Sequence, residues 1–351
     1  MKKVFKGFKV LVCVCLVVMV LGSAGCGGSR ETLNVFNWGD YIDPDVIKDF
    51  EKEYKIKVVY EEFDTNEDMY IKVDNASGKY DVVIPSDYMI SRMISEDMLI
   101  PIDMSKITNY GEVEARHKNL PFDPDNQYSV PYMWGTVGLL YNTTMVDEED
   151  VDSWDILWDA KYSKKIFMLL SIRDSMGIAL KRLGYSLNTE VESQILEARD
   201  SLMEQKPLVL SYVGDEMKDK MVNGEAAMTI AWSGDAALCI SENEDLAYVI
   251  PKEGTNIWVD SMVIPKTAQN VDAAHLFINY MCDPEIGLMN AEYIEYSSPL
   301  RAVREALPAE VTEDIAFYPG PDDLDDAEVF NDLPKDVLAM YDRAWTEVTA
   351  K

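Results

Sequence analysis

Tryptophan is followed closely by aspartate at three places outside any expected helix: Trp38 with Asp40, Trp232 with Asp235, and Trp258 with Asp260. An indole ring attracts an ammonium group through its quadrupole and can cover a methylene chain, while a carboxylate accepts the ammonium hydrogens and neutralises the charge. The three pairs therefore suit the binding of an organic cation. Each pair alone could also have a purely structural role. Its position in the fold decides between ligand binding and structure.

Two further pairs, Trp154-Asp155 and Trp158-Asp159, fall in a helix-like stretch over 153–160. Tryptophans four residues apart lie on the same face of a helix. We therefore interpret these two pairs as a packing face and leave them out of the candidate site.

Strand and helix signals alternate along the first hundred residues. Strands are predicted over 32–38, 57–63 and 80–85, and helices over 43–54, 66–77, where Asn66 is the expected cap, and 88–97. Such alternation predicts a parallel sheet, in which ligands bind outside the carboxyl ends of the strands. The residues that follow the first and third strands are then candidates for a binding site: Trp38, Asp40 and Tyr41, and Ser86 and Tyr88.

The same pattern continues in the middle of the chain, where a strand over 226–232 ends at Trp232 and a helix opens. Gly234 would let the backbone approach a ligand, and the helix N-terminus favours an anion, including the Asp235 carboxylate itself. Asp235 can equally be read as an ordinary residue of a first helical turn.

Two long apolar stretches, 127–141 and 256–265, are expected to cross between two lobes. Trp258 and Asp260 lie two apart in the second stretch and so face the same side of a strand. A carboxylate inside an apolar run is unfavourable unless it has a partner. Asp260 is therefore the strongest single candidate for a ligand contact.

The length of the chain predicts two domains, and no low-complexity linker separates them. The first lobe is expected to comprise 32–135 and about 260–300. The second is expected to comprise about 136–259 and about 301–351. We expect short crossing strands between the lobes.

Residues 1–25 have the pattern of a targeting segment, with four lysines, an apolar run over 10–21 and small residues before Cys26. The cysteine resembles the modified residue of a bacterial lipobox, which would lipidate Cys26 and anchor the chain outside the cytoplasm, with 26–31 as a tether. An ordinary cleaved signal peptide and an uncleaved anchor remain as alternatives.

Acidic side chains outnumber basic ones by 63 to 32, for a formal net charge of −31. Nucleic acid is therefore an improbable partner. Outside the N-terminal segment and Cys26, the cysteines are Cys239 and Cys282, each in an apolar helix-like context that predicts two buried thiols instead of a disulfide.

Motifs for catalysis are scarce. The sequence has no Gly-x-Ser-x-Gly elbow, no His-Glu-x-x-His and no phosphate-binding Gly-x-x-x-x-Gly-Lys. Of its two histidines, His117 is expected on a solvated surface and His275 at the core or its boundary. We expect no metal site and no cofactor. Carboxylate pairs for glycoside hydrolysis stay open, because so many acids offer many pairs.

Five groups of residues together resemble the spermidine/putrescine-binding protein (PotD) family. They occur in the same order and at similar intervals over nearly the whole chain after the targeting segment. They are 37–41 (Asn-Trp-Gly-Asp-Tyr), 80–86, 118–123 with 128–135, 182–186, and 251–265.

The resemblance implies an α/β fold of the periplasmic-binding-protein-like type II class, with two α/β lobes, a ligand cleft and crossing strands as a hinge. It implies a monomer that captures putrescine or spermidine without catalysis and delivers it to a membrane-embedded ABC permease. The family's polyamine-site positions are occupied here by Trp38, Tyr41, Ser86, Tyr88, Trp232, Trp258, Asp260 and Tyr296, with Asp174 in the place of an acidic ligand residue, and Asp40 and Asp235 in the places of acids found in putrescine-preferring relatives.

Two departures from the family's pattern bear on selectivity. Ser171 replaces an acid usual in spermidine-preferring members, and Phe330 replaces a glutamine. We therefore expect a slight shift towards putrescine or mixed binding. The alternatives are the same fold with an amino acid, sugar or iron as ligand, and an exported carboxylate hydrolase. An amino-acid site needs a cation for the carboxylate, and the cleft segments offer only Arg173.

Overall fold

The computed structural model describes residues 31–76 and 78–350. The predicted targeting segment, Cys26 and nearly all of the tether lie outside these residues. No helix in the described part of the chain combines the length and apolar character that crossing a membrane requires.

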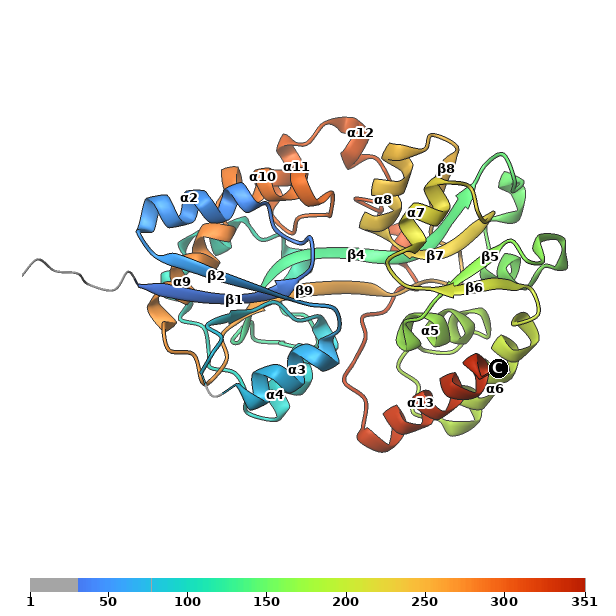
Figure 1. The fold of residues 1–351 in the computed structure, drawn as a ribbon, viewed down its shortest axis with the longest axis horizontal. Coiled ribbons are helices and arrows are strands. Elements are labelled where there is room, and N and C mark those ends of the chain that lie inside the picture. Colours follow the sequence, from blue (N-terminus) through green and yellow to red (C-terminus); the bar gives the residue numbers. More distant parts are fainter. Residues whose placement is uncertain (1–30, 77, 351) are drawn as a thin grey trace, which may run out of the picture.

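The strands of the described chain form one sheet that runs through the length of the molecule (Figure 1). Their order is β2-β1-β3-β9-β4-β7-β5-β6, and β8 pairs with β4 beside this path. The strands are β1 (Thr32–Trp38), β2 (Lys57–Phe63), β3 (Val82–Val83), β4 (Ser129–Asn142), β5 (Ile166–Leu169), β6 (Val209–Val213), β7 (Met228–Trp232), β8 (Leu246–Val249) and β9 (Ile257–Val263).

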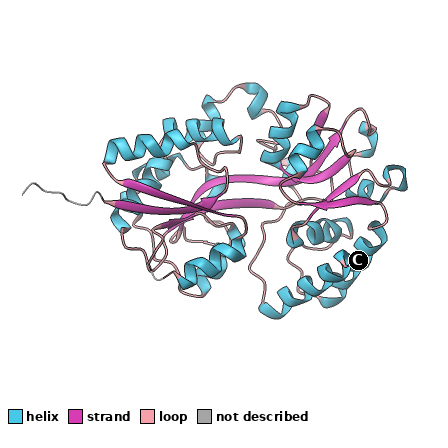
Figure 2. Cartoon of the chain, viewed as in Figure 1, coloured by secondary structure: helices cyan, strands magenta, loops and turns pink. Residues whose placement is uncertain are grey.

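Helices cover the sheet on both sides in each half of the molecule, as Figure 2 shows. In the first half, α2 and α10 lie on one side and α3 and α4 on the other; in the second half, α7 and α8 lie opposite α5, α6 and α13 (Figure 1). The helices are α2 (Pro44–Tyr54), α3 (Asn66–Asn75), α4 (Asp87–Ser95), α5 (Ile172–Arg182), α6 (Glu192–Gln205), α7 (Met217–Val222), α8 (Ser233–Glu242), α9 (Val271–Met281), α10 (Pro284–Ile294), α11 (Arg301–Ala306), α12 (Ala309–Thr312) and α13 (Lys335–Thr349).

The strands β4 and β9 run side by side from one half into the other (Figure 1). They are antiparallel, with Ser129 opposite Val263 and Thr136 opposite Ile257. Every residue of β4 is buried, and its C-terminal part continues into pairs with β7 and β8. The pairings of β1 with β2 and β3, and of β5 with β6 and β7, are parallel, whereas β3 pairs antiparallel with β9. The predicted alternation and both predicted crossing strands are therefore confirmed.

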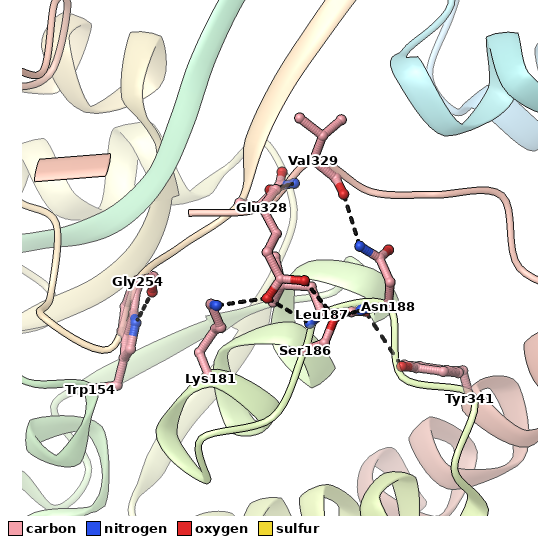
Figure 3. A network of polar contacts seen from close by, with 10 residues as sticks. Trp154, Lys181, Ser186, Leu187, Asn188, Gly254, Glu328, Val329 and Tyr341 are labelled. Atoms are coloured by element: carbon pink, nitrogen blue, oxygen red, sulfur yellow. Dashed lines mark hydrogen bonds and ion pairs between the residues drawn. The ribbon is translucent and has the colours of Figure 1, made fainter. Parts of the chain in front are cut away.

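A third segment, which leads to α13, passes between the halves and is fixed by Glu328 (Figure 3). Its carboxylate accepts bonds from Lys181 Nζ at 2.7 Å and from the Leu187 backbone at 3.3 Å, and it also accepts from the Ser186 hydroxyl. Its backbone carbonyl accepts from the N–H of Ile257, the first residue of β9, at 2.9 Å. The network thus ties the end of α5 to the start of β9. This third crossing was not predicted.

Several local predictions differ from the structure. The third strand is limited to Val82–Val83, and β8 was not predicted. The cap of α3 is Thr65, whose hydroxyl accepts from the N–H of Asp68, and Asn66 is already helical. The asparagine side chain instead contacts Ser86 and Tyr88.

The prediction for His117 was wrong. Its ring lies 4.8 Å from that of Trp134, the residue is only 4% exposed, and burial lowers its pKa to about 3. By contrast, His275, Cys239 and Cys282 are buried as expected, and both cysteines are free thiols. Trp154 is fully buried and Trp158 is partly buried in a 3-10 helix, η5 (Trp154–Trp158), so both pack against the protein, but a 3-10 helix does not place positions four apart on one face as was expected.

Candidate functional site

The central strand β4 places three of the predicted site residues on one face of the sheet. Gly135 lies opposite Trp258 on β9, and Val137 lies opposite Trp232 on β7. Residues opposite each other on neighbouring strands point to the same face, as do residues two apart. The two tryptophans therefore flank β4 on the same face, and Asp260, opposite Met133, joins them.

Asp260, which belongs to β9, is buried against residues of the first lobe. The hydroxyl of Tyr41 donates to its Oδ2 at 3.0 Å, and Ser86 forms a backbone bridge with the same residue. Its other oxygen, Oδ1, is buried and has no hydrogen-bond partner among the described residues. Burial raises the pKa of Asp260 to about 6, although the hydroxyls of Ser86 and Tyr41 favour the charged form. One carboxylate oxygen is thus free to accept a bond from a cation.

Aromatic rings surround this carboxylate. The Tyr41 ring meets the Tyr296 ring edge to face with centroids 5.4 Å apart, and the Trp258 ring lies 5.5 Å from that of Tyr296. Two glycines make room for them. A Cβ on Gly135 would lie 2.4 Å from Trp258 Cζ2, and one on Gly234 would lie 2.4 Å from the Tyr296 ring. Gly234, which we expected to admit a ligand, thus lies against an aromatic wall.

Asp235 lies in the first turn of α8 and also points at the aromatic cluster. Its Oδ1 accepts from the hydroxyl of Tyr296 at 3.0 Å and lies 3.5 Å from Nζ of Lys218 on α7. Burial raises the pKa of Asp235, against the opposing charge of Lys218. The lysine was missed, because nothing in the sequence around α7 distinguishes it from a surface residue.

Asp174 forms a second acidic position at the N-terminus of α5. The hydroxyl of Ser171, the N-cap of this helix, donates to Asp174 Oδ2 at 2.6 Å, and the Trp232 indole also favours the charged form. Burial nevertheless raises the pKa of Asp174 to about 6. Ser171, the departure from the family's pattern, therefore serves as a hydrogen-bond partner for this acid.

Arg173 lies beside these residues, and two of its three guanidinium nitrogens have partners, while its buried Nε has none among the described residues. Its nitrogens donate to Asn188 Oδ1 at 3.0 Å and to the carbonyl of Asn331 at 3.3 Å. The group lies 4.3 Å from the ring centroid of Phe330 and 5.9 Å from that of Tyr88. Phe330, the second departure from the family's pattern, thus packs against the guanidinium of Arg173 on α5, whereas a glutamine would present an amide there.

The residues after β3 form the opposite wall. Ser86 is the N-cap of α4. The side-chain amide of Asn66 donates to the hydroxyl oxygen of Ser86 at 3.1 Å and to that of Tyr88 at 3.1 Å. Tyr88 donates to Glu67 at 3.1 Å. Asp87 was not predicted: its carboxylate accepts from the N–H of Val259 at 3.1 Å and so fastens α4 to β9. Burial raises the pKa of Asp87 to about 8.

The first tryptophan-aspartate pair lies at the margin. The Trp38 ring packs 4.6 Å from that of Phe63, and its buried Nε1 has no partner among the described residues. Asp40 is exposed, with a left-handed φ of 52°, and its charge acts on Lys218 of the other half. Contacts join six of the predicted residues: Tyr41, Ser86, Asp235, Trp258, Asp260 and Tyr296. Asp174 and Trp232 interact with each other, Tyr88 is linked to Ser86 through Asn66, and Trp38 and Asp40 lie at the margin.

The side chains of this cluster are of the types that could bind an organic cation. Carboxylates accept ammonium hydrogens, and rings of tyrosine and tryptophan attract cations and cover methylene groups. Within residues 31–76 and 78–350, no three His, Cys, Asp or Glu side chains are grouped so that they could hold a metal ion. An open hollow of about 880 Å³ beside α11 and α12 shares no residue with the cluster.

Two α/β halves joined by crossing strands, with acidic and aromatic side chains gathered where the halves meet, have the arrangement of a solute-binding protein. The sequence model of the bacterial extracellular solute-binding proteins matches residues 45–319. The chain is 34% identical over 329 residues to the spermidine/putrescine-binding periplasmic protein of Salmonella typhimurium, covering 93% of this chain and 94% of the relative. It is 30% identical over 358 residues to the putrescine-binding periplasmic protein SpuD of Pseudomonas aeruginosa, covering 97% of each.

Its structure is similar to that of the spermidine/putrescine ABC transporter substrate-binding protein PotD from Streptococcus pneumoniae, with a TM-score of 0.83 and 42% identity over 91% of this chain and 98% of the other. The chain belongs to the bacterial extracellular solute-binding proteins and, among them, to the spermidine/putrescine-binding protein family. The expected periplasmic-binding-protein-like fold is confirmed. Members of this family are substrate-binding components of transporters.

Proposed function

We propose that this protein captures polyamines, putrescine or spermidine, outside the cytoplasm and delivers them to a membrane-embedded ABC permease. The observation that carries the proposal is the buried Oδ1 of Asp260, which has no partner among the described residues and lies among Tyr41, Trp258 and Tyr296. A primary ammonium group offers the three hydrogen-bond donors that such a site lacks. Family membership supports the same conclusion.

The ligand would lie along the face of β4. Asp260 binds one ammonium group, Asp174 and Asp235 mark the ends of the site, and the rings of Trp232, Trp258 and Tyr296 cover the methylene chain. The remaining contacts come from Trp38, Asp40, Tyr41, Ser86 and Tyr88. Each charge-assisted hydrogen bond contributes roughly 1.5–3 kcal/mol, against about 0.8 kcal/mol for a buried methylene. The positions of the acids should therefore rank the polyamines more strongly than the length of the site.

Closure of two lobes over the ligand is part of the proposal. The lobes comprise 32–135 with about 260–300, and about 136–259 with about 301–351, and they rotate about the crossing strands. The ion pairs of Arg301 with Glu112 and Arg304 with Glu114 favour moving the boundary near 300, so that α11 belongs to the first lobe and not to the second. In the closed form, residues from both lobes contact the ligand.

The location follows from the N-terminal sequence. We propose a monomer held at the membrane by a lipid on Cys26, with 26–31 as its tether. Labelling of cells with an alkyne fatty acid should mark the wild-type protein, and the Cys26→Ala variant should lose the label and be released. Equal labelling of both forms would refute lipidation at this residue.

Titration calorimetry against putrescine, cadaverine, spermidine, spermine, ornithine and maltose tests the function. Saturable binding of at least one polyamine, with none of maltose, is expected. Absence of heat with every polyamine would refute the proposal, and binding of ornithine alone would assign the fold to an amino-acid ligand.

A further inference from the structure

The structure places a lysine of the protein at a carboxylate that a polyamine would use. Nζ of Lys218 lies 3.5 Å from Oδ1 of Asp235, the oxygen to which Tyr296 also donates at 3.0 Å. The Lys218 side chain is one third exposed, whereas that of Asp235 is 10% exposed. A flexible ammonium therefore occupies one side of a buried acid in the ligand site.

Lys218 remains charged in this position. Burial disfavours its charge, but the carboxylates of Asp235, Asp215 and Asp40 hold its pKa above the usual value. Asp215 and Asp235 belong to the second half of the molecule, and Asp40 to the first. An ammonium displaced from Asp235 would thus keep two acidic neighbours, and the four-carbon stem of lysine allows the movement.

We propose that Lys218 is a specificity-determining residue that competes with the ligand for Asp235. A polyamine whose ammonium group reaches Asp235 must displace the lysine, and its affinity is reduced by that competition. A ligand that uses only Asp260 and Asp174 does not meet it. This inference rests on the proposed polyamine binding. It means that Lys218 supplies the positive charge beside Asp235 when no ligand is bound.

The structure supplies a matched control on the same helix. Lys220 also lies on α7 and is also one third exposed, but its partner is Glu225, at 3.2 Å. Lys220→Met removes the same charge from the same helix without changing the cation at Asp235. It therefore separates competition at the site from the general increase in negative charge, which would attract any polyamine.

Calorimetry with putrescine and spermidine on the full chain tests the proposal as a mutant cycle. Lys218→Met should tighten the Kd of at least one of the two polyamines roughly tenfold and change their ratio, because one charge-assisted contact no longer has a competitor. Lys220→Met should leave the ratio unchanged. In the Asp235→Asn background, Lys218→Met should have no effect on the ratio.

The possible outcomes separate the inference from the function. If the wild type binds polyamines and Lys218→Met has the same ratio of affinities, or binds both more weakly, the competition is refuted and the proposed function stands. If the wild type and all variants fail to bind any polyamine, the proposed function and the competition at Asp235 are both refuted. Equal melting temperatures without ligand show that a changed Kd does not reflect a damaged fold.

Discussion

Replacing Asp260 by asparagine should affect folding and binding in opposite directions. The pKa of about 6 in the folded protein lies roughly two pH units above the ordinary aspartate value, and each unit corresponds to about 1.4 kcal/mol. Because the folded pKa is raised, the charged carboxylate destabilises the ligand-free fold. The effect is absent below about pH 4, develops as the pH rises, and is complete above about pH 6.

Asparagine keeps the shape and the acceptor for Tyr41 but carries no charge. At pH 8 the free energy of unfolding of ligand-free Asp260→Asn should therefore exceed that of the wild type by up to about 3 kcal/mol. Polyamine binding should weaken by roughly ten- to a hundredfold, because the ammonium group loses a charge-assisted partner worth about 1.5–3 kcal/mol.

Urea unfolding without ligand and calorimetry with putrescine measure the two quantities. The control is Asp97→Asn, since Asp97 is an exposed acid paired with Lys266, and this variant should change neither quantity appreciably. Wild-type affinity in Asp260→Asn would show that the carboxylate does not contact the ligand. A lower free energy of unfolding would show that its charged form stabilises the fold.

Polyamine affinity should fall as the pH is lowered through about 6, because the two cleft carboxylates whose pKa burial raises to about 6 become protonated and neutral; calorimetry between about pH 5 and pH 8 would contradict this with a flat profile. Gly135→Ala should weaken binding by at least roughly tenfold, since its Cβ would lie 2.4 Å from the Trp258 ring, while Gly111→Ala, with nothing within 4 Å of its Cβ, should bind normally. Lys181→Ala should lower the free energy of unfolding by roughly 1–3 kcal/mol, because Glu328 loses its ion-pair partner, and an unchanged urea midpoint would refute this.

The fold was largely predictable because its local signals agree with its tertiary structure. The bounds of β1 and β2 match the predicted 32–38 and 57–63, and α2, which begins at Pro44 behind the cap Asp43, matches the predicted 43–54 to within one residue. The burial of His117 was not predictable in the same way. His117 lies in a charged stretch, and its ring packs against that of Trp134, which is distant in the sequence.

The candidate site was predictable where position along a strand determines direction. Trp258 and Asp260 share a face because a strand alternates, and register with β4 then adds Trp232. Contacts between distant helices were beyond such reasoning. Lys218 meets Asp235 only because α7 and α8 pack together, and no spacing in the sequence reports that distance.

The insertion of β9 between β3 and β4 also has a consequence for the kinetics of folding. Val83 of β3 pairs with Val263 of β9, so the sheet of the first half cannot be completed until most of the chain has been synthesised. Folds that depend on such distant pairings form slowly, because the cost of loop closure precedes the gain from contacts. A delayed first half would leave the chain unfolded for longer, which suits the export across a membrane that we propose.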